Sequence, residues 1–334
     1  MTSLPKISII IPLYNVEEYI VECLESVARQ TYQGEIECII VDDCGTDKSL
    51  SITEQFISDH EGKIDFKLVH HAKNRGLSAA RNTGVEHASG DYLYFLDSDD
   101  YISDDCMAVL TEPLKNKEYD MVIGDYKTFP FERIITIMND ALEELDDQVE
   151  IFKEYYIRRS LYVMAWNKLT KRDLFEKYDL SFLEGQIHED DLWTYKTNSC
   201  VRTVAIQHDK IYFYRLRENS IAYDRNTKIS KRCWSFYKTI KYILENPLQY
   251  NSNDYNKCAI HYFNHFLEFV RDDFDTNVSR YYELRNLFSY NPLVAYLRGK
   301  CKLSDVKHQF HLVLPAFLGW KYFKLKRYKN KRYD

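Results

Sequence analysis

Two clusters of carboxylates are the residues of this chain best suited to do chemistry. The stretch DYLYFLDSDDYI, residues 91–102, places Asp97, Asp99 and Asp100 directly after an apolar run. If the chain continues extended from Leu96, Asp97 and Asp99 point to one side, because strand side chains alternate with a period of two. Two such carboxylates supply half of a site for Mg²⁺ or Mn²⁺, which keep open positions for substrate phosphates. In the alternative interpretation the acids cap the next helix and stay solvated.

The second cluster lies in the stretch IHEDDLWTY and contains Glu189, Asp190 and Asp191 near the start of an expected helix. A carboxylate held in such a place can remove a proton from a hydroxyl group. Because helical neighbours point about 100° apart, Glu189 and Asp190 are not expected to face the same hydroxyl. Acids in a first helical turn are also favourable without any catalytic role. The adjacent His188 is expected to be structural.

The elements that must position these acids follow from the pattern of the first 125 residues. Short β-branched runs alternate with segments whose apolar residues recur at helical spacing. This order predicts an α/β fold with a Rossmann-like, mainly parallel sheet flanked by helices. Ligands of such sheets bind beyond the carboxyl ends of the strands. Every polar cluster falls at that rim, namely Pro12 to Asn15, Asp42 with Asp43, and Asp97 to Asp100.

Composition and charge limit the class of protein. The formal net charge of −6 argues against nucleic-acid binding by bulk attraction. The eight cysteines are scattered without a CxxC pair or zinc-like spacing, which favours a reducing, cytoplasmic compartment. The apolar run Ile7 to Tyr14 lacks a basic segment before it and is predicted to be a strand, not a signal peptide. No apolar run approaches the roughly 20 residues of a membrane span.

The pattern turns helical after about residue 225, so we expect a catalytic domain over 1–224 and a helical region over 225–334. That region is expected to be a scaffold, and its aromatic residues are weak evidence for a homodimer. From Lys321 to Asp334 there are seven Lys or Arg against one acid. Such a basic, tyrosine-rich end suits an anionic membrane surface, and a core helix with a solvated tail is the alternative.

Three spaced blocks carry a resemblance to a known family. The blocks SIIIPLYN, IIVDDCGTDKS and NRGLSAARNTGVEHASGDYLYFLDSDD occur in this order between residues 8 and 100. Across residues 5 to 125 the chain resembles the family 2 inverting glycosyltransferases of the bacterial surface-polysaccharide type, which have the GT-A fold. One small departure is Cys44, which follows the acids where the family more often shows Gly-Ser.

The resemblance implies a UDP-sugar donor and a role for each block. It places Tyr14 beside the uracil and Asp43 in a hydrogen bond to it, and it makes Asp99 the main ligand of Mn²⁺ or Mg²⁺ with Asp97 as its partner. It also makes Asp190 the general base, and Glu189 the residue that orients the acceptor. Further residues expected to contact the nucleotide-sugar are Pro12, Asn15, Arg81, Asp97, Ser98 and Arg217. Arg215 and Ser220 are candidate phosphate contacts, while Lys73 and Asn74 stay ambiguous. The family's metal-ligand histidine has no clear counterpart in this sequence, and His208 is the nearest candidate.

The implied reaction is an inverting transfer of a sugar to a hydroxyl of a glycan or lipid-linked oligosaccharide, at or near the inner face of the cell membrane. Two other classes compete with it. One is a catalytically silent nucleotide-binding scaffold, against which the cluster at 189–191 counts. The other is a sugar nucleotidyltransferase, which would need a glycine-rich, basic loop after the first strand, and IPLYNVEEYI offers none.

Overall fold

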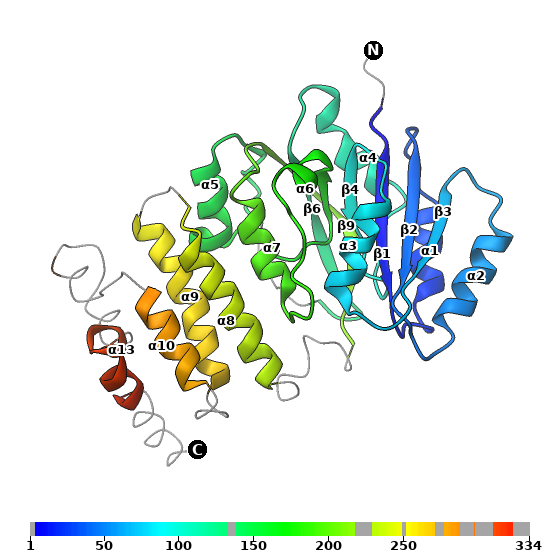
Figure 1. Cartoon of the computed structure of the whole chain (residues 1–334). Coiled ribbons are helices and arrows are strands. Elements are labelled where there is room, and N and C mark those ends of the chain that lie inside the picture. The colour runs from blue at the N-terminus through cyan, green and yellow to red at the C-terminus, as the bar shows by residue number, and fades with distance from the viewer. Residues whose placement is uncertain are drawn as a thin grey trace. The chain divides into compact units, whose positions relative to one another are not determined.

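The computed structural model describes residues 4–132, 138–217, 229–248, 252–270, 277–287, 297 and 310–322. The chain forms two compact units, Met1–Asp224 and Arg225–Asp334. Figure 1 shows the strands in the first unit and a group of helices in the second.

The amino-terminal half of the first unit is built on four parallel strands. These are β1 (Ile7–Leu13), β2 (Ile36–Asp42), β3 (Asp65–His70) and β4 (Tyr92–Phe95), in the order β3-β2-β1-β4. Every residue of β1 and β2 is buried, which explains their unbroken apolar runs. The parallel sheet predicted for this part of the chain is therefore confirmed.

Helices α1 (Ile20–Ala28), α2 (Ser49–Asp59) and α3 (Leu77–His87) connect these strands. Helix α3 packs on β1 and β2, and it does so closely at Gly84. A Cβ atom on Gly84 would lie 2.2 Å from Ile10 Cγ2 of β1, so a larger residue would require Ile10 or the helix to shift. The missing side chain lets α3 lie directly on the sheet.

The other half of the sheet is mixed. It contains β5 (Tyr101–Ile102), β6 (Met121–Phe129), β7 (Glu144–Leu145), β8 (Lys168–Lys171) and β9 (Val204–Arg215). Strand β8 is antiparallel to both β4 and β6, and β9 is parallel to β6 but antiparallel to β5 and β7. The sheet as a whole is therefore mixed, because the strand–helix alternation that makes β1 to β4 parallel does not continue into this half.

Short helices surround this second half. They are α4 (Cys106–Thr111), the 3₁₀ turn η1 (Pro113–Lys115), α5 (Gln148–Lys153), the π-helical turn η2 (Glu154–Arg158), α6 (Asp173–Lys177) and α7 (Glu189–Thr197). Helix α7 begins at the predicted position, and the residue before it, His188, has a positive φ of 61°. The second acidic cluster therefore occupies the first turn of α7.

The described part of the second unit is helical, as predicted. It contains α8 (Ile229–Glu245), α9 (Ser252–Val270), α10 (Val278–Leu287) and α13 (Phe310–Val313). Helix α8 packs against α9 and α10, and Tyr237 Oη of α8 donates to Glu283 of α10 at 2.6 Å. Among the helices that the structure describes, none is both long and apolar enough to cross a membrane. Most of the basic end, from residue 323 onward, lies outside the described residues.

Candidate active site

The segment after β4 carries the first acidic cluster to the carboxyl-end rim of the sheet. Its extended continuation does not form, because the chain turns at residues 98–99 and the Asp100 N–H donates to the Asp97 carbonyl at 3.0 Å. The expectation that Asp97 and Asp99 share one side of a strand is therefore wrong. Each carboxylate instead has its own cationic partner.

Arg81 of α3 is the partner of Asp97, and it also reaches the second acidic cluster. Its Nη2 donates to Asp97 Oδ1 at 2.8 Å, and its Nη1 donates to Glu189 Oε1 and to Asp190 Oδ1, both at 2.9 Å. The Arg81 side chain is 1% exposed. One buried guanidinium thus joins acids that lie more than 90 residues apart in the sequence.

Glu189 and Asp190 leave the helix in different directions but meet at one cation. Both carboxylates bind the same nitrogen, Arg81 Nη1. The angle of 100° applies to the directions in which side chains leave the helix. Side chains that differ by one methylene can still bend toward a single atom, so the angle alone does not keep the two carboxylates apart.

The electrostatics of this cluster are unbalanced, because three carboxylates share one guanidinium. Burial and the charge of Asp190 raise the pKa of Glu189, and Arg81 only partly opposes them. Burial likewise raises the pKa of Asp190 against the opposing charge of Arg81. A carboxylate with a raised pKa is a stronger proton acceptor once ionised, and this suits Asp190 to general-base chemistry.

The remaining acids of the first cluster bind the end of β9. Asp99 Oδ2 accepts from Arg217 Nε at 2.6 Å. Asp100 is 1% exposed and accepts from Tyr212 Oη at 2.6 Å and from the Arg215 N–H at 2.7 Å. Burial raises the pKa of Asp99 and, more strongly, that of Asp100. Asp100 is therefore a structural residue that holds the acidic turn, residues 97–100, against β9.

Arg215 and Arg217 lie on one side of the chain, beside Tyr19. Their guanidinium carbons are 4.8 Å and 5.6 Å from the centre of the Tyr19 ring. Arg215 Nε also donates to the Asp99 carbonyl at 2.8 Å. Ser220, the third residue expected here, lies outside the described residues.

The chemistry of Asp97 and Asp99 fits a divalent cation that is bound together with a diphosphate. Both supply hard oxygen ligands, and their side chains are 23% and 17% exposed. Each carboxylate has one oxygen engaged by an arginine. Among the described residues no group of three or more His, Cys, Asp or Glu could hold a metal ion alone. Within the described part of the chain, His208 does not join Asp97 and Asp99 in such a group, and its Nε2 bonds to the Leu142 carbonyl at 3.0 Å.

Asp43, at the end of β2, organises the loop that leads into α3. Its Oδ1 binds His71 Nδ1 and the Arg75 N–H, both at 2.7 Å. Its Oδ2 accepts from Asn74 Nδ2 at 2.9 Å and from the Gly76 N–H at 2.7 Å. Gly76 has a φ of 91°, a conformation that glycine adopts without strain. Asp43 thus fixes the start of α3, and its contact with a uracil stays a prediction.

The residues after β1 divide into buried and exposed positions. Pro12 is buried in β1 opposite Val41 of β2, so its side chain is part of the sheet interior. Tyr14 is 46% exposed, and Asn15 Oδ1 accepts from the Thr46 N–H at 2.7 Å. Of these residues, Tyr14 offers an accessible surface to a ligand.

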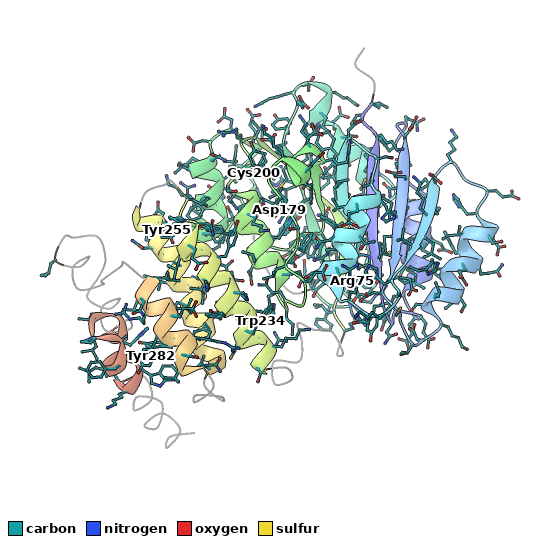
Figure 2. All side chains as sticks on the ribbon, viewed as in Figure 1. Arg75, Asp179, Cys200, Trp234, Tyr255 and Tyr282 are labelled. Carbon is teal, nitrogen blue, oxygen red and sulfur yellow. The ribbon has the colours of Figure 1, made fainter. Side chains whose placement is uncertain are left out.

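Sequence reasoning missed two buried residues of this region, Tyr212 and Lys168. Lys168 of β8 is fully buried, although it is a lysine. The available signal was its position in AWNKLT, where a charged residue interrupts a run that pairs as a central strand. Not every arginine near α3 is buried as Arg81 is. Arg75 precedes α3 and is labelled in Figure 2, and it forms an exposed ion pair with Glu184 at 2.7 Å.

Comparison with known proteins gives the class to which this site belongs. The family model "Glycosyl transferase family 2" matches residues 8–179. The chain therefore belongs to glycosyltransferase family 2, as its sequence blocks predicted, and the acidic turn and the α7 cluster belong to a glycosyltransferase.

Individual relatives agree with this assignment. The chain is 30% identical to glycosyltransferase GlyG of Streptococcus pneumoniae, over 64% of this chain and 72% of GlyG. It is 34% identical to glycosyltransferase GlyA of the same species, over 65% of this chain but 31% of GlyA. The crystal structure of S. aureus TarS 1-349 in complex with UDP-GlcNAc is similar with a TM-score of 0.71 and 20% identity, and the match covers 92% of this chain and 90% of that one. The fold is thus GT-A, with a helical carboxyl-terminal region.

Proposed function

We propose that this glycosyltransferase moves a sugar from a UDP-sugar to a hydroxyl of a glycan or lipid-linked saccharide acceptor in cell-surface polysaccharide synthesis. The observation that carries the proposal is the contact of Arg81 with Asp97, Glu189 and Asp190. This contact brings the acidic turn after β4 and the first turn of α7 into one site. The UDP-GlcNAc bound in the TarS structure supports a UDP-sugar as the donor.

In the proposed reaction Asp190 is the general base. It removes the proton of the acceptor hydroxyl as the acceptor oxygen attacks the anomeric carbon from the face opposite UDP. The bond to UDP breaks in the same displacement, and the configuration at the anomeric carbon inverts. Glu189 orients the acceptor, and Arg81 holds both carboxylates in place instead of contacting the nucleotide.

The donor is proposed to lie along the rim formed by the ends of β1, β2 and β4. Tyr14 would contact the uracil, and Asp43 would form a hydrogen bond to it. Asn15 would also contact the nucleotide-sugar, and Ser98 would approach the sugar. Arg217 would bind the diphosphate, for which it must exchange its ion pair with Asp99. Positive charge at this place stabilises the departing diphosphate.

The metal ion in this proposal is Mn²⁺ or Mg²⁺. Asp99 would be its main protein ligand and Asp97 the second. When bound, the ion neutralises negative charge that develops on the diphosphate. The two carboxylates would therefore bind the metal more tightly in the presence of UDP than in its absence.

The two units have separate parts in the proposal. Residues 1–224 form the catalytic domain, and residues 225–334 support it. The basic end of the sequence would hold the protein at the inner face of the membrane, near a lipid-linked acceptor. The proposal also includes a homodimer, in which two copies of the chain associate through the aromatic residues of the helical region 225–334. Sedimentation of the full chain tests this.

The test uses Asp190→Asn with Asp191→Asn as the matched control in the same helical turn. UDP release from UDP-GlcNAc is followed with poly(ribitol phosphate) as the acceptor, which is the acceptor in the name of the relative TarS. Further UDP-sugars are then screened as donors. Asp190→Asn should bind UDP as the parent does in calorimetry but lose transfer, whereas Asp191→Asn should retain it. Equal transfer by Asp190→Asn and the parent contradicts the assignment of the base, and UDP binding without transfer by the parent supports a silent scaffold.

A further inference from the structure

Lys168 is a buried charged residue that the proposed reaction does not use. Its side chain is 0% exposed, and its Nζ donates to the carbonyls of Tyr162 at 2.8 Å and of Met164 at 2.5 Å. The centres of the Tyr155 and Tyr162 rings lie 5.2 Å and 4.8 Å from Lys168 Nζ. The two carbonyls and the aromatic faces together satisfy an ammonium group that has no access to water.

The carbonyls that Lys168 holds belong to a segment that acts on the proposed base. The Ala165 backbone N–H, one residue after Met164, lowers the pKa of the Asp190 carboxyl and so partly opposes the effect of burial. Ala165 is itself 0% exposed. The position of this backbone donor therefore depends on the peptide units that Lys168 binds.

Helix α7 holds the same segment from the other side. Thr194 Oγ1 donates to the Val163 carbonyl at 2.6 Å. Thr194 and Asp190 are four residues apart and lie on one face of α7. The carbonyls of Tyr162, Val163 and Met164 are thus all bound, two by Lys168 and one by Thr194.

Burial of a lysine is unfavourable, and an apolar side chain of similar length would fill the same space. Burial lowers the pKa of Lys168 to about 7, although the charge of Asp190 partly opposes this effect. A methionine would not have this cost, but it could not donate to either carbonyl. What the lysine adds is therefore the fixed geometry of residues 162–165.

We propose that Lys168 is a positioning residue for Asp190. By holding the carbonyls of Tyr162 and Met164 it keeps the Ala165 N–H in place, and this N–H together with Arg81 fixes the Asp190 carboxylate. The inference rests on the proposed function, because it assumes that Asp190 is the base. It assigns to β8 a part in catalysis that involves no contact with substrate.

The test compares Lys168→Met with the parent in the full chain. Transfer should fall about 10- to 100-fold in kcat with an unchanged KM for the UDP-sugar, since a misplaced base slows only the chemical step. Thr170→Val is the matched control. It is buried on the same strand, two residues away and on the same face, and its hydroxyl has no hydrogen-bond partner among the described residues. Thr170→Val should transfer at the parent rate.

The second readout does not depend on activity. In protein labelled with ¹⁵N-alanine, the Ala165 amide signal, identified by its absence from Ala165→Ser, should move and exchange faster with solvent in Lys168→Met. If Lys168→Met does not fold, Thr194→Val loosens the same segment from α7 and should move the same signal. An unmoved Ala165 signal, or an unchanged kcat, overturns the inference.

The outcome for Asp190→Asn separates this inference from the proposed function. If Asp190→Asn is inactive while Lys168→Met behaves as the parent, the inference fails and the assignment of the base stands. If Asp190→Asn retains transfer, the base is another residue, and the inference fails with that assignment.

Discussion

Replacement of Arg81 by methionine tests the central contact of the site. The variant keeps an unbranched, apolar side chain, but it leaves Asp97, Glu189 and Asp190 without the guanidinium that each of them binds. Removal of one partner from a buried ion pair typically costs about 3–5 kcal/mol. For a domain of this size such a loss lowers the Tm by roughly 6–20 °C.

The control for Arg81→Met is Arg75→Met, six residues earlier in the chain. Arg75 pairs with Glu184, but the two side chains are 41% and 48% exposed. Exposed pairs contribute about 0–1 kcal/mol. Arg75→Met should therefore melt within a few degrees of the parent, and the difference between the variants isolates the effect of burial.

The effect of Arg81→Met also depends on pH. Without the guanidinium, the pKa values of Glu189 and Asp190 in the folded protein rise further above their unfolded values. The folded variant then binds more protons than the unfolded chain between about pH 4 and the raised pKa values. Its stability falls as the pH rises through this window, so its deficit against the parent should be smaller at pH 5 than at pH 8.

The assay is urea unfolding of the parent and both variants at pH 5 and pH 8, followed by circular dichroism. Two results would refute the reasoning. One is a deficit of Arg81→Met no larger than that of Arg75→Met. The other is a deficit that is the same at both pH values, because it would mean that the carboxylates do not depend on Arg81 for their charge.

Three further predictions concern separate parts of the protein. Asp99→Ala should lose the Mn²⁺-dependent part of UDP binding in calorimetry, as EDTA does with the parent, and unchanged metal dependence would exclude Asp99 as the main ligand. The pKa of Lys168, lowered by burial to about 7, means that the unfolded chain binds more protons between pH 7 and pH 10. The parent should therefore gain stability over Lys168→Met as pH rises through this range, and a constant difference in unfolding free energy contradicts this. Burial raises the pKa of Glu37, but Lys67 and hydroxyl and amide donors outweigh it and lower the value to about 2. Glu37→Gln should therefore cost about 1–3 kcal/mol at pH 7 and progressively less as pH falls from 4.5 toward 2, as acid unfolding curves can show.

The sequence predicted the positions of the acids well and their partners poorly. The ends of β1, β2 and β4 and the start of α7 follow from periodicity, which is a local property. The choice of Arg81 as the common partner depends on how α3 lies against the sheet, which no local pattern reports. Asp97 and Asp99 were expected to share one side of a strand because extended backbone was assumed after Leu96, and the turn at residues 98–99 removes that arrangement.

The second half of the sheet was less predictable for the same reason. Strand β8 reverses direction between two neighbours, and its lysine interrupts an apolar pattern that would otherwise have marked it as buried. A buried lysine is rare enough that sequence reasoning assigns such a residue to the surface. The role of Tyr212 could not be predicted from the sequence, because its bond to Asp100 joins segments 112 residues apart.

The close approach at Gly84 has a consequence for attempts to change the specificity of this enzyme. Arg81 lies three residues before Gly84 on α3, so the absent side chain sets the height of the guanidinium above β1. Alanine at position 84 would require Ile10 or the helix to shift, and a shift of the helix would move Arg81 together with the three carboxylates that it binds. Helix α3 is therefore a fixed reference for the reaction centre, and libraries that seek a new donor or acceptor should leave it untouched and vary residues that do not rest on it.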